Sequence, residues 1–300
     1  MVPEMEGPAR LAAALAHTPL GIDVVESRSR QMDGYTIETL SLKIGGAIVR
    51  GIVTRPLTAP APGPAILYAH SHGGGYAIGA TELLEGRDYL QDALGPILAK
   101  RGYVCLAIDM PCFGTRSDIT ESFAAKALLW RGRSLIGRML DEQAAALSYL
   151  CAREDVDTAR VGAYGMSMGS TLSYWLAALD PRIASVAHVC CFADQREMIR
   201  LGAHDGHGFY MTVPGLLDRF DAGSIAALVA PRPQLICLGG VDPLTPPSAV
   251  EIALNDVVQG YGQHPDRLET LIDPDAGHQE TPRMRDAVLQ FFDRTLRPTV

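Results

Sequence analysis

The chain has 300 residues, of which 47% are hydrophobic and 20% are charged, a balance typical of a globular protein with a large buried core. Its formal net charge at pH 7 is −8, which argues against nucleic acid as a general partner, because phosphate binding needs a basic surface. The sequence contains no apolar run of the roughly 18 residues that a membrane-spanning helix needs, so we also expect no membrane partner.

The start of the chain and the cysteines bear on its location. Residues 1–6 are acidic and lack the basic region and apolar core of a secretion signal, so we expect a cytoplasmic protein. Cys105, Cys190, Cys191 and Cys237 lie in apolar runs, where a free cysteine behaves as a small hydrophobic residue. Cys190 and Cys191 are adjacent in a predicted strand, and neighbouring residues of a strand point to opposite faces, so these two thiols are not expected to form a redox pair. We therefore expect all the thiols to be reduced.

The N-terminal part predicts a helix and then a hairpin. Residues 9–16 are rich in alanine and leucine and predict a short helix within an N-terminal helical extension over residues 1–34. This helix would lie against the body of the protein or against a second subunit, so a homo-oligomer stays open. Residues alternate at 35–44 and 47–54 around two glycines, which predicts an antiparallel hairpin at the edge of the sheet.

A glycine-rich loop follows the first strand of the predicted central sheet. A connector rich in proline and alanine over residues 56–64 leads into an apolar strand at 65–69, and His72, Gly73 and Gly74 lie in the loop after it. Such a loop can supply a backbone N–H to the negative oxygen of a tetrahedral intermediate. A phosphate-binding loop is the alternative, but the lysine of a P-loop does not follow.

The next segment predicts a helix at 82–100 and a strand at 103–109. Residues 116–139 then exceed what a minimal α/β fold needs, and we interpret them as a cap-like helical insertion in which Trp130 is a candidate pocket residue. Its surplus of positive charge would attract an anionic substrate, although we favour a solvated helix face or a subunit contact. An amphipathic helix is predicted at 141–153.

Residues 164–170 read Tyr-Gly-Met-Ser-Met-Gly-Ser, between a predicted strand at 159–163 and a predicted helix at 171–179. A serine between two glycines at such a junction is typical of a nucleophile elbow. The glycines suit this turn because a side chain at either position would collide with the neighbouring strand and helix. Ser167 Oγ would then be exposed above the sheet, with the Met168 amide directed at the group that the serine attacks.

A second cap-like insertion is predicted at 192–223, after a strand at 184–191. Its aromatic and apolar side chains could line an acyl or alcohol pocket, and the candidates are Phe209, Tyr210 and Met211. Three more of its side chains are metal ligands by type but do not follow a known ligand spacing, so we interpret them as loop or pocket residues. They are His204, Asp205 and His207.

Two later loops supply an acid and a base. An apolar run at 233–238 predicts a strand with Asp242 on the loop at its carboxyl end, and a run at 268–272 places His278 on the next such loop. The order serine, aspartate, histidine, each after a separate strand, is that of the α/β-hydrolase triad. Because the carboxyl ends of parallel strands share one edge of a sheet, we expect both residues to converge with Ser167.

Other side chains compete for these roles. Asp273 and Asp275 are alternative acids, but they share a loop with His278 and would need a tight turn to reach it. Four other histidines are alternative bases, but none combines a late position with a loop at a strand end. They are His70, His72, His188 and His264.

From about residue 64 onwards, the chain resembles α/β-hydrolases of the dienelactone hydrolase and acetyl-xylan-esterase-like group. The resemblance implies one domain over 1–300 with a mostly parallel sheet flanked by helices, a serine nucleophile, a small-molecule ester as substrate, and neither metal nor other cofactor. The segments that carry it are 69–75, 102–104, 108–109, 113–116, 164–170, 230–233 and 276–278.

The resemblance leaves open which loop amide completes the oxyanion hole with Met168. The run His-Gly-Gly-Gly at 72–75 is similar to that of hormone-sensitive-lipase-like esterases, which favours Gly74. Alignment of the run His-Ser-His at 70–72 with the His-Gly-x of dienelactone hydrolases favours His72.

The sequence therefore predicts a serine hydrolase that cleaves a carboxylic ester through an acyl-enzyme. Two alternatives remain: the same triad acting on a C–C, thioester or amide bond, and a receptor-like hydrolase fold that binds a ligand with little turnover.

Overall fold

A nine-stranded sheet forms the centre of the structure, a computed structural model that describes residues 7–58 and 62–297. The expectation for residues 1–6, and part of the connector predicted at 56–64, lie outside these ranges. The strands are β1 (Ile22–Gln31), β2 (Tyr35–Ile44), β3 (Ala47–Pro56), β4 (Gly63–Ala69), β5 (Val104–Ile108), β6 (Val156–Met166), β7 (Ser185–Val189), β8 (Gln234–Gly239) and β9 (Leu268–Asp273).

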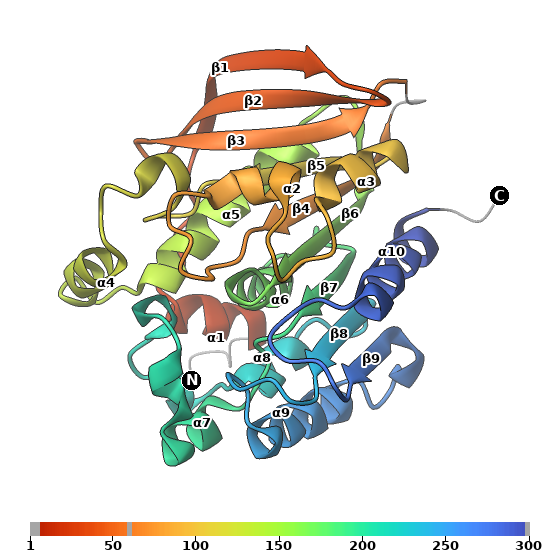
Figure 1. Cartoon of the computed structure of the whole chain (residues 1–300). Helices are drawn as coiled ribbons and strands as arrows, with labels where there is room; N and C mark the ends of the chain where they lie inside the picture. Colours follow the sequence, from red (N-terminus) through yellow and green to blue (C-terminus); the bar gives the residue numbers. More distant parts are fainter. Residues whose placement is uncertain (1–6, 59–61, 298–300) are drawn as a thin grey trace, which may run out of the picture.

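Across the sheet the strands follow the order β1-β2-β3-β5-β4-β6-β7-β8-β9 (Figure 1). Strands β1, β2, β3 and β5 pair antiparallel, and the strands from β5 to β9 pair parallel. The parallel strands β4, β5, β7 and β8 are largely apolar and buried along their whole length, which is typical of a sheet covered by helices on both faces. This is the mostly parallel α/β architecture that the sequence predicts.

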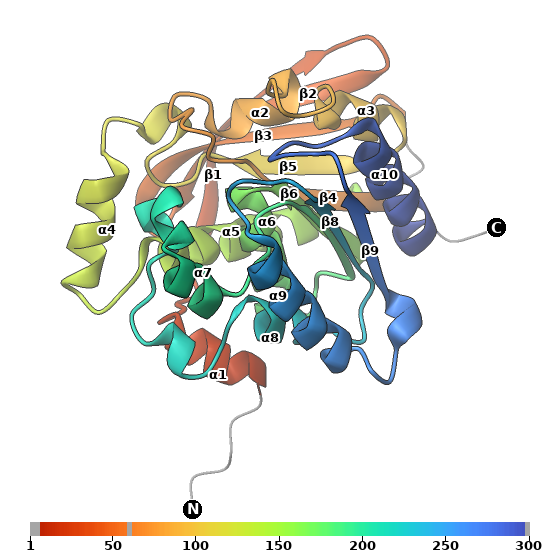
Figure 2. The ribbon, with the colours of Figure 1, turned by 60° about the horizontal axis from the view of Figure 1, so that its bottom comes forward.

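The described residues also form ten α-helices. They are α1 (Gly7–Ala14), α2 (Glu82–Glu85), α3 (Leu94–Lys100), α4 (Glu121–Leu129), α5 (Leu135–Cys151), α6 (Met168–Leu179), α7 (Gln195–Leu201), α8 (Ala222–Ala227), α9 (Pro247–Gly260) and α10 (Pro282–Leu296). Figure 2 shows α2, α3 and α10 over one face of the sheet and α5, α6, α8 and α9 over the other. In the described part of the chain, none of these helices combines the length and apolar character that crossing a bilayer requires.

The N-terminal segment differs from the prediction. The predicted hairpin is present as β2 and β3, but it does not form the edge of the sheet, because β1 pairs outside it. Among the described residues of the predicted 1–34 extension, α1 is therefore the one helix, and the segment after it forms an edge strand. Nearly every residue of β1 is exposed. A strand with no buried face lacks the alternation of apolar and polar residues that reveals a strand in a sequence.

Two predicted helices have different bounds. The helix predicted at 82–100 is two short helices separated at Gly86, whose φ is +66° and where a Cβ would lie 3.2 Å from backbone atoms of Asp92 and Ala93. The helix predicted at 141–153 begins earlier, at Leu135, because the Ser134 side chain caps it by accepting a hydrogen bond from the Gly137 amide. Within the insertion predicted at 116–139, α4 is thus the one separate α-helix.

Helix α10 packs closely on the centre of the sheet. Phe291 and Phe292 are fully buried, and a Cβ on Gly162 of β6 would lie 2.9 Å from the ring of Phe292. The absence of a side chain at residue 162 therefore brings α10 against the strand that leads to residue 167.

We expect Phe292→Ala to lower the free energy of unfolding by about 3–5 kcal/mol, the usual cost of an aromatic-sized cavity in a packed core. Phe123→Ala on α4 is the matched control, because that ring is 66% exposed. Urea unfolding followed by circular dichroism measures both variants. Equal stability of the two would contradict the packing described for α10.

Candidate active site

The backbone turns sharply at Ser167, between β6 and α6. Its φ is +57° and its ψ is −117°, a conformation that costs free energy in a residue with a side chain. A Cβ on Gly169 would overlap the carbonyl oxygen of Ala69 in β4, and one on Gly165 would overlap the backbone of Gly169. The Ser167 amide donates to the Val189 carbonyl at 2.9 Å. The predicted elbow is present, and close backbone contacts hold it.

The three residues that the sequence predicts to converge are joined by hydrogen bonds. His278 Nε2 lies 2.8 Å from Ser167 Oγ, and His278 Nδ1 lies 2.7 Å from Asp242 Oδ2. The carboxylate is buried and also accepts a hydrogen bond from the Leu244 amide at its other oxygen. A carboxylate on Nδ1 fixes the imidazole tautomer in which Nε2 is free to accept the serine proton.

The loops that carry the acid and the base are bound to each other. The Gly240 amide donates to the Asp273 carbonyl at 2.7 Å, and the Val241 amide donates to the Ala276 carbonyl at 3.0 Å. Asp273 thus supports the loop through its backbone, which leaves Asp242 as the acid in contact with His278.

The alternative histidines have other partners. His70 is fully buried, and its Nε2 accepts a hydrogen bond from the Met110 amide at 3.1 Å. His188 is buried beneath the elbow, and His264 precedes a 3₁₀ turn at Pro265–Arg267.

The glycine-rich loop after β4 folds around the ring of His72. The Gly74 amide donates to His72 Nδ1 at 3.1 Å, and the Gly75 amide donates to the His72 carbonyl at 2.9 Å. His72 Nε2 lies 2.6 Å from Glu121 Oε2. Since Nδ1 accepts a hydrogen bond, Nε2 carries the ring hydrogen and donates a hydrogen bond to the carboxylate.

Glu121, at the start of α4, is a part of the site that the sequence analysis does not identify. Besides His72, its carboxylate accepts hydrogen bonds from the Tyr76 hydroxyl at 3.0 Å and the Tyr210 amide at 2.8 Å. Burial alone would raise the pKa of Glu121, but the hydrogen bonds from His72 and the Tyr210 amide outweigh it and lower that pKa. One ionised carboxylate thus joins the glycine-rich loop and both insertions.

A buried glutamate holds the other end of the same loop. The Ser71 amide and the Tyr68 hydroxyl each donate to Glu82 Oε1 at 2.9 Å. Ser71 Oγ also lies 2.5 Å from the Tyr89 hydroxyl. The loop is therefore fixed by side chains that follow it in the sequence.

The chain leaves β7 earlier than predicted, at Val189, and the next two residues, Cys190 and Cys191, have φ of +59° and +53°. Ser170 Oγ donates to the Cys190 carbonyl at 2.7 Å and lies 3.1 Å from His188 Nδ1. His188 Nε2 lies 3.0 Å from the side-chain amide of Gln234. This buried network supports an unfavourable backbone conformation next to the serine.

The six cysteines all lie within the described residues, where none of them is part of a disulfide.

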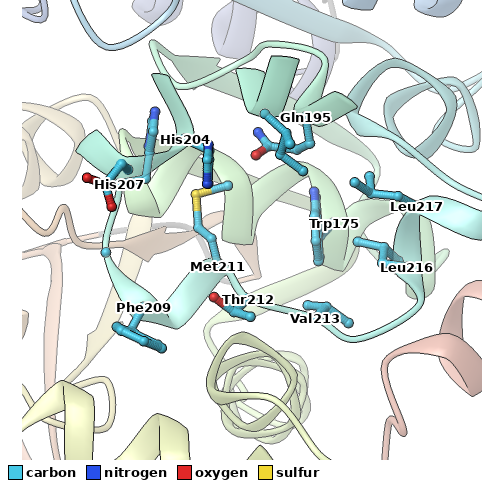
Figure 3. Close-up of a pocket in the computed structure, with 13 residues that line it drawn as sticks. Trp175, Gln195, His204, His207, Phe209, Met211, Thr212, Val213, Leu216 and Leu217 are labelled. Atoms are coloured by element: carbon cyan, nitrogen blue, oxygen red, sulfur yellow. The ribbon is translucent and has the colours of Figure 1, made fainter. Parts of the chain in front are cut away.

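A cavity of about 370 Å³ lies in the second insertion, next to α6 (Figure 3). Phe209 and Met211, two of the residues proposed for a substrate pocket, line it together with His204, Asp205 and His207. Among the described residues, its lining does not include the Ser167, His278 and Asp242 side chains. Its link to them is indirect, because His207 Nε2 lies 2.9 Å from the carbonyl of Leu244, two residues after Asp242.

The other two predicted pocket residues lie elsewhere. Trp130 is 92% exposed and does not line this cavity, so its prediction as a pocket residue is wrong. Tyr210 is buried, and its ring stacks on His72 with 5.7 Å between the ring centroids. It therefore packs against the glycine-rich loop.

The positive charges of the first insertion are largely paired. Arg138 Nε donates to Glu142 at 2.7 Å, Arg116 binds the same carboxylate, and Arg133 binds Asp141. Both acids are buried in α5, which the sequence analysis treats as a separate helix. This pairing removes much of the charge surplus that attraction of an anionic substrate would need.

Comparison with known proteins places the chain in a family. The sequence model described as "Dienelactone hydrolase family" matches residues 89–198. "Putative hydrolase YtaP" of Bacillus subtilis (strain 168) is 35% identical over 281 residues, which is 93% of this chain and 93% of that protein. The chain belongs to the dienelactone hydrolase family. Membership makes hydrolysis the class of reaction.

Solved structures share the fold. One titled as a "putative acetyl xylan esterase" from Bacteroides fragilis NCTC 9343 has a TM-score of 0.71 and 19% identity, and the match covers 98% of this chain and 76% of that one. A glucuronoyl esterase from Solibacter usitatus has a TM-score of 0.68 and 15% identity, with 97% and 92% covered. At these identities the likeness shows the α/β-hydrolase fold of the family alone.

The buried His188 makes stability depend on pH. Burial lowers the pKa of His188 from 6.5 to about 3, so between these pH values the unfolded chain binds a proton that the native protein does not. The free energy of unfolding should therefore fall as the pH decreases below 6.5, by about 1.4 kcal/mol per pH unit from this residue. Above pH 6.5 the contribution is constant.

Urea unfolding of His188→Gln between pH 7 and pH 5 should accordingly show a pH slope shallower than that of the wild type by about this amount. His264→Gln, at an exposed position, is the control and should keep the wild-type slope. A wild-type slope in His188→Gln would show that this histidine is not the titrating group.

Proposed function

We propose that this protein is a serine hydrolase that cleaves a carboxylic ester through Ser167, His278 and Asp242. The observation that carries the proposal is the chain of two hydrogen bonds, 2.8 Å and 2.7 Å long, from the serine at the elbow to a buried carboxylate. A base that is oriented by a buried carboxylate and contacts a strained serine is the arrangement that nucleophilic catalysis needs.

In this mechanism Ser167 Oγ attacks the carbonyl carbon while His278 Nε2 takes its proton. The imidazolium that forms is stabilised by Asp242, and it returns the proton to the leaving alcohol. Water then attacks the acyl-enzyme by the same route and releases the acid. Neither half-reaction requires a metal ion or another cofactor.

Backbone amides would bind the oxyanion. One is the Met168 amide, at the N-terminus of α6. Of the loop candidates, the Gly74 amide already donates to the His72 ring, which favours the His72 amide as the second donor over Gly74. Gly73, between them, has a φ of +45° and shapes the turn. His72 would thus act through its backbone, and its ring would hold the loop.

The choice of an ester as the substrate is supported by the structural neighbours, whose titles describe acetyl xylan, glucuronoyl and other esterases. The triad itself would serve thioesters, amides or C–C bonds as well. Identification of the products released from an ester series distinguishes these reactions.

We expect hydrolysis of p-nitrophenyl esters from acetate to octanoate to be lost in Ser167→Ala and His278→Ala. In Asp242→Asn we expect kcat to fall by about 10⁴-fold, because the amide favours the wrong imidazole tautomer. His264→Ala is the control for histidine loss. Full activity of Ser167→Ala would overturn the mechanism, and a folded wild type without activity on these esters would favour cleavage of another kind of bond or a receptor-like role.

The role of Glu121 is testable apart from the triad. In Glu121→Gln, an NH₂ group replaces one of the two carboxylate oxygens and cannot accept a hydrogen bond. It must face either the Tyr210 amide or the donors from His72 and Tyr76, so at least one hydrogen bond is lost and we expect the loop to shift. Loss of an oxyanion donor costs roughly 10²–10³-fold in kcat, and we expect Glu121→Gln to lower kcat towards this range with little change in KM.

Asp118→Asn, an exposed change in the same insertion, is the matched control and should behave like the wild type. A rise in KM alone for Glu121→Gln would instead indicate that Glu121 contacts the substrate.

A further inference from the structure

Cys190 lies beside the acid and the base. Its Sγ, a carboxylate oxygen of Asp242 and a ring nitrogen of His278 all lie within 4.8 Å of one another. The three residues follow β7, β8 and β9, which are neighbours in the sheet, so their side chains meet at one edge. The mechanism proposed above uses the acid and the base but has no role for this thiol.

The backbone fixes the thiol in this place. The Cys190 carbonyl is held by Ser170, and the Cys190 amide donates to the Cys237 carbonyl of β8 at 2.8 Å. The Sγ is buried and lies 3.8 Å from the carbonyl oxygen of Gln279, the residue after His278. The two backbone hydrogen bonds fix the Cα of Cys190, so the Sγ stays beside the triad unless the buried side chain changes its rotamer.

The donor types match those that bind thiophilic divalent cations. Thiolate, imidazole and carboxylate are the ligands of Zn²⁺, with bonds of about 2.0–2.3 Å, which in a tetrahedral site places ligand atoms roughly 3.5 Å apart. Movements of about an ångström would bring these three atoms to that spacing. A divalent cation with one thiolate and one carboxylate is also electrically neutral, which favours its burial.

We propose that Cys190, Asp242 and His278 form a binding site for a thiophilic divalent cation, Zn²⁺ or Cd²⁺, whose occupation inhibits the hydrolase. The inhibition rests on the proposed function, but the binding does not. On binding, the Cys190 thiol releases its proton to solvent, and the imidazole loses its Nδ1 proton and takes one up at Nε2. The Nε2–H then points at Ser167 and cannot accept the serine proton, so the base is lost without any change in oxidation state.

The neighbouring Cys191 supplies a matched control, because it has other partners. Its Sγ accepts a contact from the Thr171 hydroxyl at 3.6 Å and lies 3.9 Å from His207 Nδ1. Cys190 is fully buried, whereas His278 is partly exposed, so a cation can reach the thiol only after side chains around it move. Inhibition should therefore develop slowly after mixing.

Binding is measured first, in Ser167→Ala, which keeps all three ligands and removes turnover. Titration with Cd²⁺ should produce the ultraviolet charge-transfer absorption of a cadmium thiolate, saturating at one cation per chain. The absorption should persist in the double variant that combines Ser167→Ala with Cys191→Ser. It should disappear when Ser167→Ala is combined with Cys190→Ser or with His278→Ala. Circular dichroism checks that each variant is folded. A saturating absorption that survives in folded Cys190→Ser, or none in Ser167→Ala, would overturn the site.

Inhibition is measured in the otherwise wild-type protein with p-nitrophenyl acetate. Zn²⁺ and Cd²⁺ should inhibit slowly, EDTA should restore activity, and Mg²⁺, which prefers oxygen ligands, should have no effect. The inhibitory concentration should rise roughly tenfold or more in Cys190→Ser and stay unchanged in Cys191→Ser. Equal inhibition of both variants would contradict the proposal. If no ester is cleaved at all, the absorption titration still tests the cation site.

Discussion

The structure depends on the close approach of three backbone segments at the elbow. The turn at Ser167 is possible because the two glycines beside it allow β6 and α6 to touch and allow α6 to begin against the carbonyl of Ala69. Backbone atoms cannot yield as the end of a side chain can, so the contact fixes where α6 starts. The position of the serine relative to the strands on either side follows from this contact.

The two halves of the candidate site share their support. The Glu280 amide, two residues after His278, donates to the Tyr89 carbonyl at 2.9 Å, and the Tyr89 hydroxyl contacts Ser71 of the glycine-rich loop. The Glu280 carboxylate binds Arg285 and also accepts from the Tyr164 hydroxyl at 3.0 Å. Movement of the loop that carries His278 would therefore disturb the glycine-rich loop, and the buried charges make such movement costly.

Features of the structure that depend on nearby residues can be predicted from the sequence, whereas features that depend on distant residues cannot. The hairpin of β2 and β3 and the three strand-end residues Ser167, Asp242 and His278 are predicted because each depends on neighbours in the sequence. Strand β1 is missed because no face of it is buried. Glu121 is missed because its three donors come from segments as far as 89 residues away, and a single acid at a helix start resembles any other. Trp130 is misjudged because an apolar residue in an insertion is equally compatible with solvent.

The carboxylate of Glu121 also determines how freely this scaffold can be altered. Its hydrogen bonds tie α4, the second insertion and the glycine-rich loop into one unit, although the insertions look like additions to a common core. An exchange of the first insertion between relatives would remove a support of the glycine-rich loop together with the segment exchanged. The insertions therefore cannot be exchanged independently of the glycine-rich loop. A replacement insertion would support this loop only if it placed a carboxylate where Glu121 lies.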